Sequence, residues 1–303
     1  VESRGLGDVY KRQGGGMLMM PLSGILTSKF GSRKIMLFGS IIIAFTIPIL
    51  AISSSIPVMS LTLFLFGGGI GMLDVSMNTH GVIVEKHYKK PIFSFLHGLF
   101  SVGGLVGALC LSFLIKWGLA PFYASLILSI FILFILFNQQ RNLFSLDFEQ
   151  NEVQNTIVKE EKGEIKTNAW LNGRVLMLGF FCFSFFLIEG AMLDWGAIFL
   201  IDVKRIPIEL SGMGYASFSI AMAGMRLIGG KIITKLSSHQ VIVGGGVIAI
   251  VGLSFIIYSN AISLILFGFA LVGIGVANSV PVLFSTGGNI KKIKISLVLS
   301  VIT

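Results

Sequence analysis

Long apolar runs recur along the whole chain, and short polar connections separate them. The runs have about the length that an α-helix needs to cross a bilayer core, roughly 20 residues. They do not alternate polar and apolar residues, as membrane-spanning β-strands do. The pattern therefore predicts an all-α membrane protein. We expect spanning helices at 14–29, 34–52, 57–83, 92–115, 119–138, 171–193, 209–229, 240–258 and 261–285, and a further run from 293.

The composition agrees with lipid as the surrounding medium. Hydrophobic residues make up 54% of the chain and charged residues only 12%, whereas soluble domains carry about 25% charged residues. The net charge of +9 does not indicate a nucleic-acid-binding protein, because the basic residues form short clusters between apolar runs and no basic face.

The basic residues predict the orientation of the chain in the membrane. They lie mainly in alternate connections, and cytoplasmic loops of multi-spanning proteins carry an excess of Lys and Arg. The opposite connections hold Lys116, Lys204 and Arg205. We therefore expect a multi-pass protein of the bacterial inner (plasma) membrane with the basic connections in the cytoplasm. Those connections contain Lys29, Arg33, Lys34, Lys86, Lys89, Lys90, Arg141, Lys159, Lys162, Lys166, Arg174, Lys231, Lys235, Lys291, Lys292 and Lys294.

A polar segment divides the chain into two apolar halves. Residues 139–170 are rich in Glu, Lys, Gln and Asn and cannot bury enough apolar surface to pack alone, so we expect a cytoplasmic linker. The halves are then an N-terminal bundle at 14–138 and a C-terminal bundle at 171–303. Residues 1–13 are polar and look like translated adaptor sequence, which we exclude from the fold. We also expect the natural protein to be truncated at both ends of this chain.

The two halves repeat each other. The stretch 24–34 aligns with 230–240, and the stretch 69–78 aligns with 273–282, at nearly the same offset. Two helical bundles with parallel orientation, related by an axis along the membrane normal, are one of the plans on which transporters are built. The repeat therefore predicts two pseudo-symmetric bundles.

The connection after the first run resembles the signature loop between helices 2 and 3 of the major facilitator superfamily. Ser28 stands where that motif has an acid. The stretches 67–108, 188–200 and 275–285 resemble helices 4 and 5, helix 7 and helix 10 of the fucose-permease-like branch. The positions that match the loop motif are Gly24, Lys29, Gly31, Arg33 and Lys34.

This resemblance implies a twelve-helix transporter of which the chain covers helices 2 to about 11. Helices 2–6 form the first bundle, and helices 7–10 with part of 11 lie in the second. The resemblance also implies alternating access, in which two bundles rock about a substrate held near mid-membrane, and a gating role for the signature loop.

Charge inside the apolar runs points to candidate binding residues, because an unpaired charge in a membrane costs from about 3 to above 10 kcal/mol. Asp74 lies well inside its run, and Asn78 follows at i+4 on the same helical face. The resemblance implies that this acid faces the cavity and takes part in proton coupling. An acid that is hydrogen-bonded to backbone or to a neighbouring helix, with a structural role only, is the alternative.

Four further polar residues lie within the runs. Glu189 is a candidate for substrate or proton contact, and Asn278, the repeat partner of Asp74, is a candidate for cavity contact. His97 is a candidate proton shuttle because imidazole titrates near neutral pH; a hydrogen-bonded packing residue is the alternative. We expect Arg226 to extend its side chain to the cytoplasmic surface, with a cavity role as the alternative.

These features predict a secondary active transporter that moves a small polar solute, sugar-like by resemblance, with proton coupling. Efflux of a drug or metabolite and a non-transporting membrane sensor are the alternatives. We expect no enzyme, no cofactor and no metal site, because the sequence contains no nucleophile–base pair or metal motif within the runs. The expected partners are a small-molecule substrate, protons and the lipid bilayer, without nucleic acid, and the expected state is a monomer.

Overall fold

The computed structural model describes residues 2–151, 169–290 and 293–303, with residues 2–11 described by their backbone alone. The N-terminal half contains α1 (Glu2–Phe30), α2 (Ser32–Ile52), α3 (Ile56–Tyr88), α4 (Phe93–Lys116), α5 (Pro121–Gln139) and the 3₁₀ turn η1 (Gln140–Asn142). The C-terminal half contains η2 (Ala169–Leu171), α7 (Gly173–Asp194), α8 (Gly196–Asp202), η3 (Ile208–Leu210), α9 (Gly212–Ile233), α10 (Ser238–Tyr258), α11 (Ile262–Val276), α12 (Ser279–Gly288) and α13 (Ile295–Ile302).

Eight helical segments of the described chain are long and apolar enough to cross a membrane, which confirms the expected all-α membrane fold. The run expected at 14–29 is not among them. It forms the second half of α1, which begins at Glu2 and so includes most of the polar segment that we excluded from the fold. Residues 152–168, most of the expected linker, lie outside the described residues.

The run expected as one helix at 261–285 is two helices. The first, α11, ends at Val276, and α12 begins at Ser279, with Asn278 at the junction. Pro281 explains the break, because a proline has no N–H to donate and its ring clashes with the carbonyl four residues earlier. That carbonyl belongs to Ala277, which therefore cannot accept the helical hydrogen bond that residue 281 would otherwise donate.

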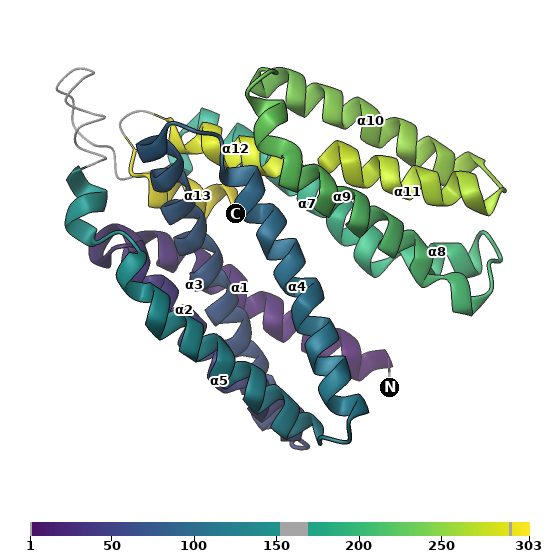
Figure 1. Ribbon diagram of the computed structural model, residues 1–303, viewed down its shortest axis with the longest axis horizontal. Coiled ribbons are helices and arrows are strands. Elements are labelled where there is room, and N and C mark those ends of the chain that lie inside the picture. The colour runs from purple at the N-terminus through teal and green to yellow at the C-terminus, as the bar shows by residue number, and fades with distance from the viewer. Residues whose placement is uncertain (1, 152–168, 291–292) are drawn as a thin grey trace.

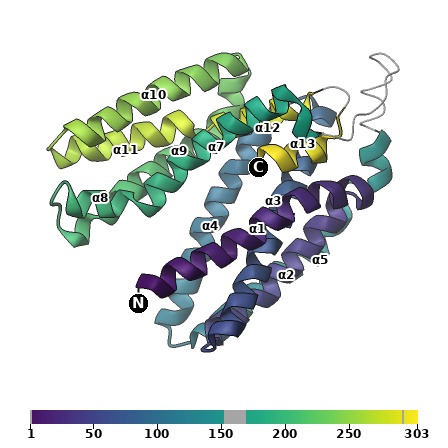
Figure 2. The same cartoon turned by 180° about the vertical axis from the view of Figure 1, so that it is seen from behind.

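The helices form two groups (Figure 1). Helices α1–α5 lie on one side and α7, α9, α10 and α11 on the other, and the groups meet near α12 and α13 and diverge away from them. Between the groups, α4 packs against α9, α1 against α13, and α12 against α3 and α4. The view from behind shows α1 running past the C-terminal end of the chain (Figure 2).

Glycines bring α10 and α11 into close contact. A Cβ atom added at Gly252 would lie 2.6 Å from the backbone carbonyl oxygen of Gly268, and one added at Gly268 would lie 2.6 Å from that of Gly252. Small residues let membrane helices approach closely, and van der Waals packing of this kind holds helices together in lipid. This contact therefore requires glycine on both helices.

Gly252→Ala is expected to destabilise the protein, because the added methyl group has to push α11 away from α10. Overpacking of this kind costs about 1–3 kcal/mol. The measurement is the thermal unfolding transition of the purified protein in detergent. Gly246→Ala on the same helix is the matched control, since a Cβ there meets nothing within 4 Å, and it should leave the transition unchanged or raise it slightly. Equal shifts for the two variants would contradict the close helix contact.

Candidate functional site

Two of the five residues predicted to bind substrate or protons form a pair on α3. Asn78 Nδ2 donates a hydrogen bond of 2.8 Å to Asp74 Oδ1, as the i+4 spacing predicts. Asn78 is buried and Asp74 is half-buried. Within the described chain, the hydrogen bond from Asn78 is the one hydrogen bond of the Asp74 carboxylate, and it comes from the same helix.

Arg226 on α9 is the centre of a second polar group. Its Nη2 lies 3.2 Å from Glu189 Oε2 on α7, its Nε donates to the carbonyl oxygen of Ala277 at 3.1 Å, and its Nη1 donates to Ser101 Oγ on α4 at 3.2 Å. The residue is only 5% exposed. The expectation that Arg226 extends to the cytoplasmic surface is therefore wrong, because each guanidinium nitrogen has a partner inside the protein.

The helix break at Pro281 supplies one of these partners. In a continuous helix the N–H of residue 281 would donate to the carbonyl of Ala277, but proline has no N–H. The free carbonyl oxygen accepts from Arg226 instead. The helix break therefore provides a hydrogen-bond acceptor for the buried guanidinium, and the guanidinium provides a donor for the carbonyl that the break leaves without one.

Asn278 and His97 lie beside the Arg226 group, each with a polar atom that has no partner. Asn278 Nδ2 donates to the carbonyl of Met225 at 3.4 Å, while its Oδ1 lies against Gly229 without a hydrogen bond. His97 Nε2 is also buried without a partner and lies within electrostatic range of Arg226. Buried polar atoms without a partner are uncommon in proteins; they also occur elsewhere among the described residues, and these two are the ones that lie beside Arg226.

The structure therefore divides the predicted binding residues into two sets. Glu189, Asn278 and His97 gather around Arg226, where α4, α7, α9 and the break between α11 and α12 meet. Asp74 and Asn78 form their own pair on α3, and no hydrogen bond joins the two sets within the described residues. The described residues also contain no cluster of three or more His, Cys, Asp or Glu side chains suited to a metal ion.

The signature loop lies at the junction of α1 and α2. Gly31 has a positive φ of 86°, a conformation that favours glycine. Gly24 packs α1 against α13, since a Cβ there would lie 2.8 Å from the backbone carbonyl oxygen of Ser296. The basic members of the loop are Lys29 at the end of α1 and Arg33 and Lys34 in the first turn of α2.

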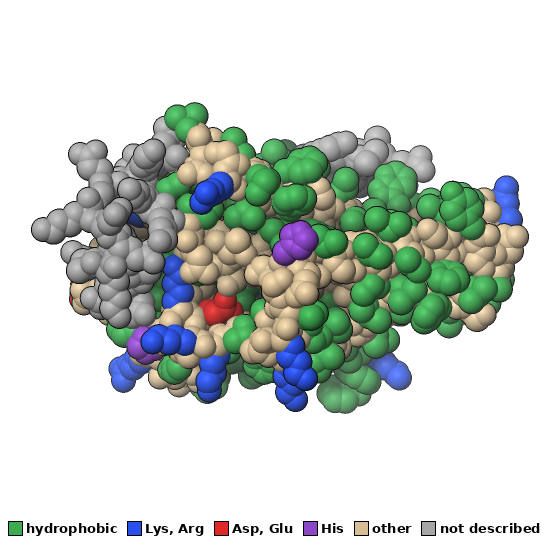
Figure 3. Space-filling model, turned by 90° about the horizontal axis from the view of Figure 1, so that it is seen from above, with side chains coloured by type: hydrophobic (Ala, Val, Ile, Leu, Met, Phe, Trp, Pro, Cys, Tyr) green, Lys and Arg blue, Asp and Glu red, His purple; other side chains and the backbone are tan. Residues whose placement is uncertain are grey.

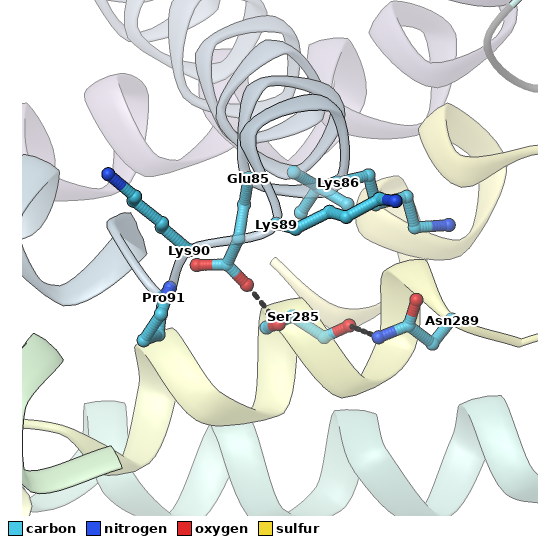
Figure 4. A pocket seen from close by; sticks show the side chains of 8 residues that line it. Glu85, Lys86, Lys89, Lys90, Pro91, Ser285 and Asn289 are labelled. Atoms are coloured by element: carbon cyan, nitrogen blue, oxygen red, sulfur yellow. Dashed lines mark hydrogen bonds between the residues drawn. The ribbon is translucent and has the colours of Figure 1, made fainter. Parts of the chain in front are cut away.

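A pocket of about 320 Å³ lies where the α3–α4 connection meets α12 (Figure 4); we call it the seam pocket. The carboxylate of Glu85 accepts hydrogen bonds from the Ser285 hydroxyl and, at 2.9 Å, from the backbone N–H of Phe93. Lys86 Nζ donates to the carbonyl oxygen of Gly288. The contacts with Ser285 and Gly288 tie the two halves of the chain together. The pocket is lined by Val82, Glu85, Lys86, Lys89, Lys90, Pro91, Ser285 and Asn289.

Sequence reasoning missed the seam pocket because it ended the third run at 83 and placed the next residues in a loop. In the structure α3 continues to Tyr88, so Glu85 and Lys86 are helical and turn toward α12. Figure 3 shows this end of the molecule, where basic side chains surround an acidic side chain in a hollow of the surface. The sequence signal was the helix-compatible stretch between 83 and Pro91, which contains no glycine or proline to end a helix.

A double-mutant cycle between Glu189 and Arg226 is expected to show coupling. Glu189→Gln and Arg226→Gln should each lower the thermal unfolding transition, because each leaves a charge without its partner in the membrane interior. The double variant should lose less than the sum, with a coupling energy of about 1–3 kcal/mol. Arg141→Gln, at an exposed arginine in η1, is the control and should change little. Additive losses would show that the two side chains do not interact.

Comparison with proteins of known sequence agrees with this architecture. The family profile of the Major Facilitator Superfamily matches residues 13–291. An uncharacterised MFS-type transporter of Yersinia pestis is 36% identical over 275 residues, which cover 91% of this chain and 68% of the relative. An uncharacterised transporter of Sinorhizobium fredii is 29% identical over 89% of this chain and 69% of its own length.

Comparison with solved structures shows the same fold at low identity. The proton:xylose symporter XylE superposes with a TM-score of 0.75 at 13% identity, over 98% of this chain and 75% of XylE. FucP in its outward conformation gives a TM-score of 0.62 at 15% identity, over 98% of this chain and 80% of FucP. The second match agrees with the expected resemblance to fucose permease, and at this identity it shows the shared fold. The profile match and the Yersinia relative show more than the fold: the chain belongs to the Major Facilitator Superfamily.

Proposed function

We propose that the protein is a proton-coupled secondary transporter of a small polar solute that works by alternating access. The observation that carries the proposal is the presence of two polar groups inside the membrane-spanning part, the Asp74–Asn78 pair and the cluster around Arg226. Buried ionisable residues in membrane helices mark substrate and ion pathways. A carboxylate with a free oxygen suits a proton, and the unsatisfied atoms beside Arg226 suit a solute.

The chemistry of the Arg226 cluster favours a neutral, hydroxyl-rich solute. Arg226 is already neutralised by Glu189, so a further fixed charge on the solute would have no counter-ion there. A hydroxyl group, in contrast, can donate to Asn278 Oδ1, which has no donor at present. Two of the solved relatives in fold, XylE and FucP, are described as proton symporters of xylose and fucose, which is consistent with a sugar-like substrate.

The proposed orientation places the basic end, with the seam pocket, in the cytoplasm of a bacterium. Glu85 and Lys86 join the two halves at this end, so the conformation would be closed toward the cytoplasm. Movement of the two bundles about the central polar groups would break these contacts and open the cytoplasmic side. The signature loop lies at the same end of the molecule, where it would guide that movement.

Asp74→Asn is expected to abolish uphill accumulation of the solute, because an amide cannot take up and release a proton. Counterflow exchange should persist in part, since the amide still hydrogen-bonds to Asn78 and the cavity keeps its shape. Asp74→Glu should be milder, because it keeps the titrating group and moves it by one methylene. The measurement is pH-dependent uptake and counterflow in vesicles that contain the full-length protein.

Asp202→Asn is the matched control for this experiment, since Asp202 is an exposed acid at the end of α8. It should leave both uptake and counterflow unchanged. If Asp74→Asn still accumulates solute with the wild-type dependence on pH, Asp74 has a structural role only, and Glu189 becomes the candidate for proton coupling. Solute-stimulated signalling without flux would instead indicate a sensor, and proton-driven loss of solute from the cell would indicate efflux.

The orientation has its own test. Ser145→Cys, at an exposed position after η1, should stay unlabelled when whole cells meet a membrane-impermeant thiol reagent, because that segment lies on the cytoplasmic side. Ser54→Cys, between α2 and α3 at the opposite end, should be labelled. Both variants belong in a background without Cys110 and Cys182. Labelling of Ser145→Cys but not of Ser54→Cys would show that the orientation in the membrane is opposite to the proposed one.

A further inference from the structure

Glu149, in the segment after α5, is a buried acid to which sequence reasoning gave no role. Its side chain is only 7% exposed, and acids are almost never fully buried unless they are paired. It accepts a hydrogen bond of 3.1 Å from the backbone N–H of Ser32 and another from the Ser32 hydroxyl. His80 Nδ1, on α3, lies 3.5 Å from Glu149 Oε1 and 2.8 Å from Ser32 Oγ.

This carboxylate serves the beginning of α2. The first N–H groups of a helix have no partner within the helix, and the residue before α2 is Gly31, which has no side chain to cap them. Glu149 supplies an acceptor there, and a negative charge at a helix N-terminus is also favoured by the helix dipole. One side chain from outside the helix thus does what a local cap would otherwise do.

Apolar and aromatic contacts hold the same segment in place; we call residues 144–149 the docked segment. The Phe144 ring lies 4.1 Å from that of Phe148 and 5.3 Å from that of His80. Leu146 packs under the signature loop, where a Cβ at Gly31 would lie 3.2 Å from its Cβ. The docked segment therefore contacts the signature loop, the start of α2 and the last turns of α3 together.

We propose that Glu149 is a positioning residue of the transport cycle, which fastens the docked segment to α2 and α3 so that these ends move as one unit. The last turns of α3 carry Glu85 and Lys86, the residues that join the two halves at the seam pocket. When the Glu149 contacts hold, movement of the N-terminal bundle is transmitted to the contacts of Glu85 and Lys86. When they are lost, the bundle deforms internally instead. This role rests on the proposed alternating access, but the docking itself does not.

Glu149→Gln tests the docking by amide hydrogen exchange of the full-length protein in lipid nanodiscs. Loss of the charge should speed exchange in the first turn of α2, at residues 32–35, by on the order of threefold, because the amide oxygen still accepts a hydrogen bond but no longer carries the negative charge that the helix dipole favours. Asp147→Asn is the matched control, since Asp147 is an exposed acid two positions away, and it should change nothing. Unchanged exchange in Glu149→Gln would overturn the docking and the proposal with it.

The positioning role is tested by the rate at which a cysteine in the seam pocket is labelled. Val82→Cys is the reporter, because Val82 is buried there and packs against Gly288. Glu149→Gln should speed its labelling by a permeant thiol reagent several-fold, Glu149→Asp less, and Asp147→Asn not at all. The maximal transport rate should fall in the same order with little change in KM. Faster exchange without faster labelling would show that Glu149 only stabilises the fold. If the wild-type protein moves no solute, the proposed function fails, while exchange and labelling still decide whether Glu149 positions α3.

Discussion

A guanidinium inside the membrane-spanning part of a protein has to be met by protein groups. Arginine does not lose its proton under physiological conditions, and Arg226 is 5% exposed, so its charge is balanced where it stands. Glu189 supplies the counter-charge, Ala277 a backbone carbonyl and Ser101 a hydroxyl. The positions of α4, α7 and α9 and the break after α11 are constrained by this one side chain.

The break after α11 shows how sequence, backbone and charge depend on each other. Pro281 removes a hydrogen bond to the backbone carbonyl of Ala277, and an unsatisfied backbone carbonyl in lipid costs roughly several kcal/mol. Arg226 Nε donates a hydrogen bond of 3.1 Å to this carbonyl instead. The junction of α11 and α12 can lie close to α9 because residue 229 is a glycine. The Asn278 amide and the Ser94 side chain lie against it.

The sequence predicts well those features that depend on local spacing and on the lipid environment. Apolar runs become helices because a membrane span has to satisfy its backbone internally, and Asp74 meets Asn78 because i and i+4 share a face. The partners of Arg226 could not be predicted in this way, since they lie 37, 51 and 125 positions away along the chain. Its place near the end of the run expected at 209–229 suggested a route to the surface, and the packing of three other segments shows that the side chain does not take it.

The same limit applies to the loop between α1 and α2. Ser28 stands where the signature motif has an acid, and the sequence offers no substitute nearby. The carboxylate at the start of α2 comes from Glu149, 117 positions from Ser32. Any group that the fold brings to a helix end can cap it. The absence of a capping residue nearby in the sequence therefore does not mean that the helix end is uncapped in the structure.

The distribution of partners between the two bundles bears on how they can move. Glu189, Arg226 and Ala277 all belong to the C-terminal bundle, and Asp74 and Asn78 belong to a single helix of the other. Among the described residues around Arg226, the hydrogen bond from Arg226 to Ser101 is the one that crosses between the bundles. Separating the bundles there would break one hydrogen bond between a charged donor and a neutral hydroxyl. The net contribution of such a bond is about 1.5–3 kcal/mol, and its loss would leave no ion unpaired.

At the seam pocket the hydrogen bonds that cross between the halves do involve charged side chains, Glu85 and Lys86. The pocket opens at the surface, where water can replace a lost partner. The Glu189–Arg226 pair thus lies within one bundle, and the charged contacts that cross between the halves lie at the seam pocket, which is compatible with the rocking movement that we propose.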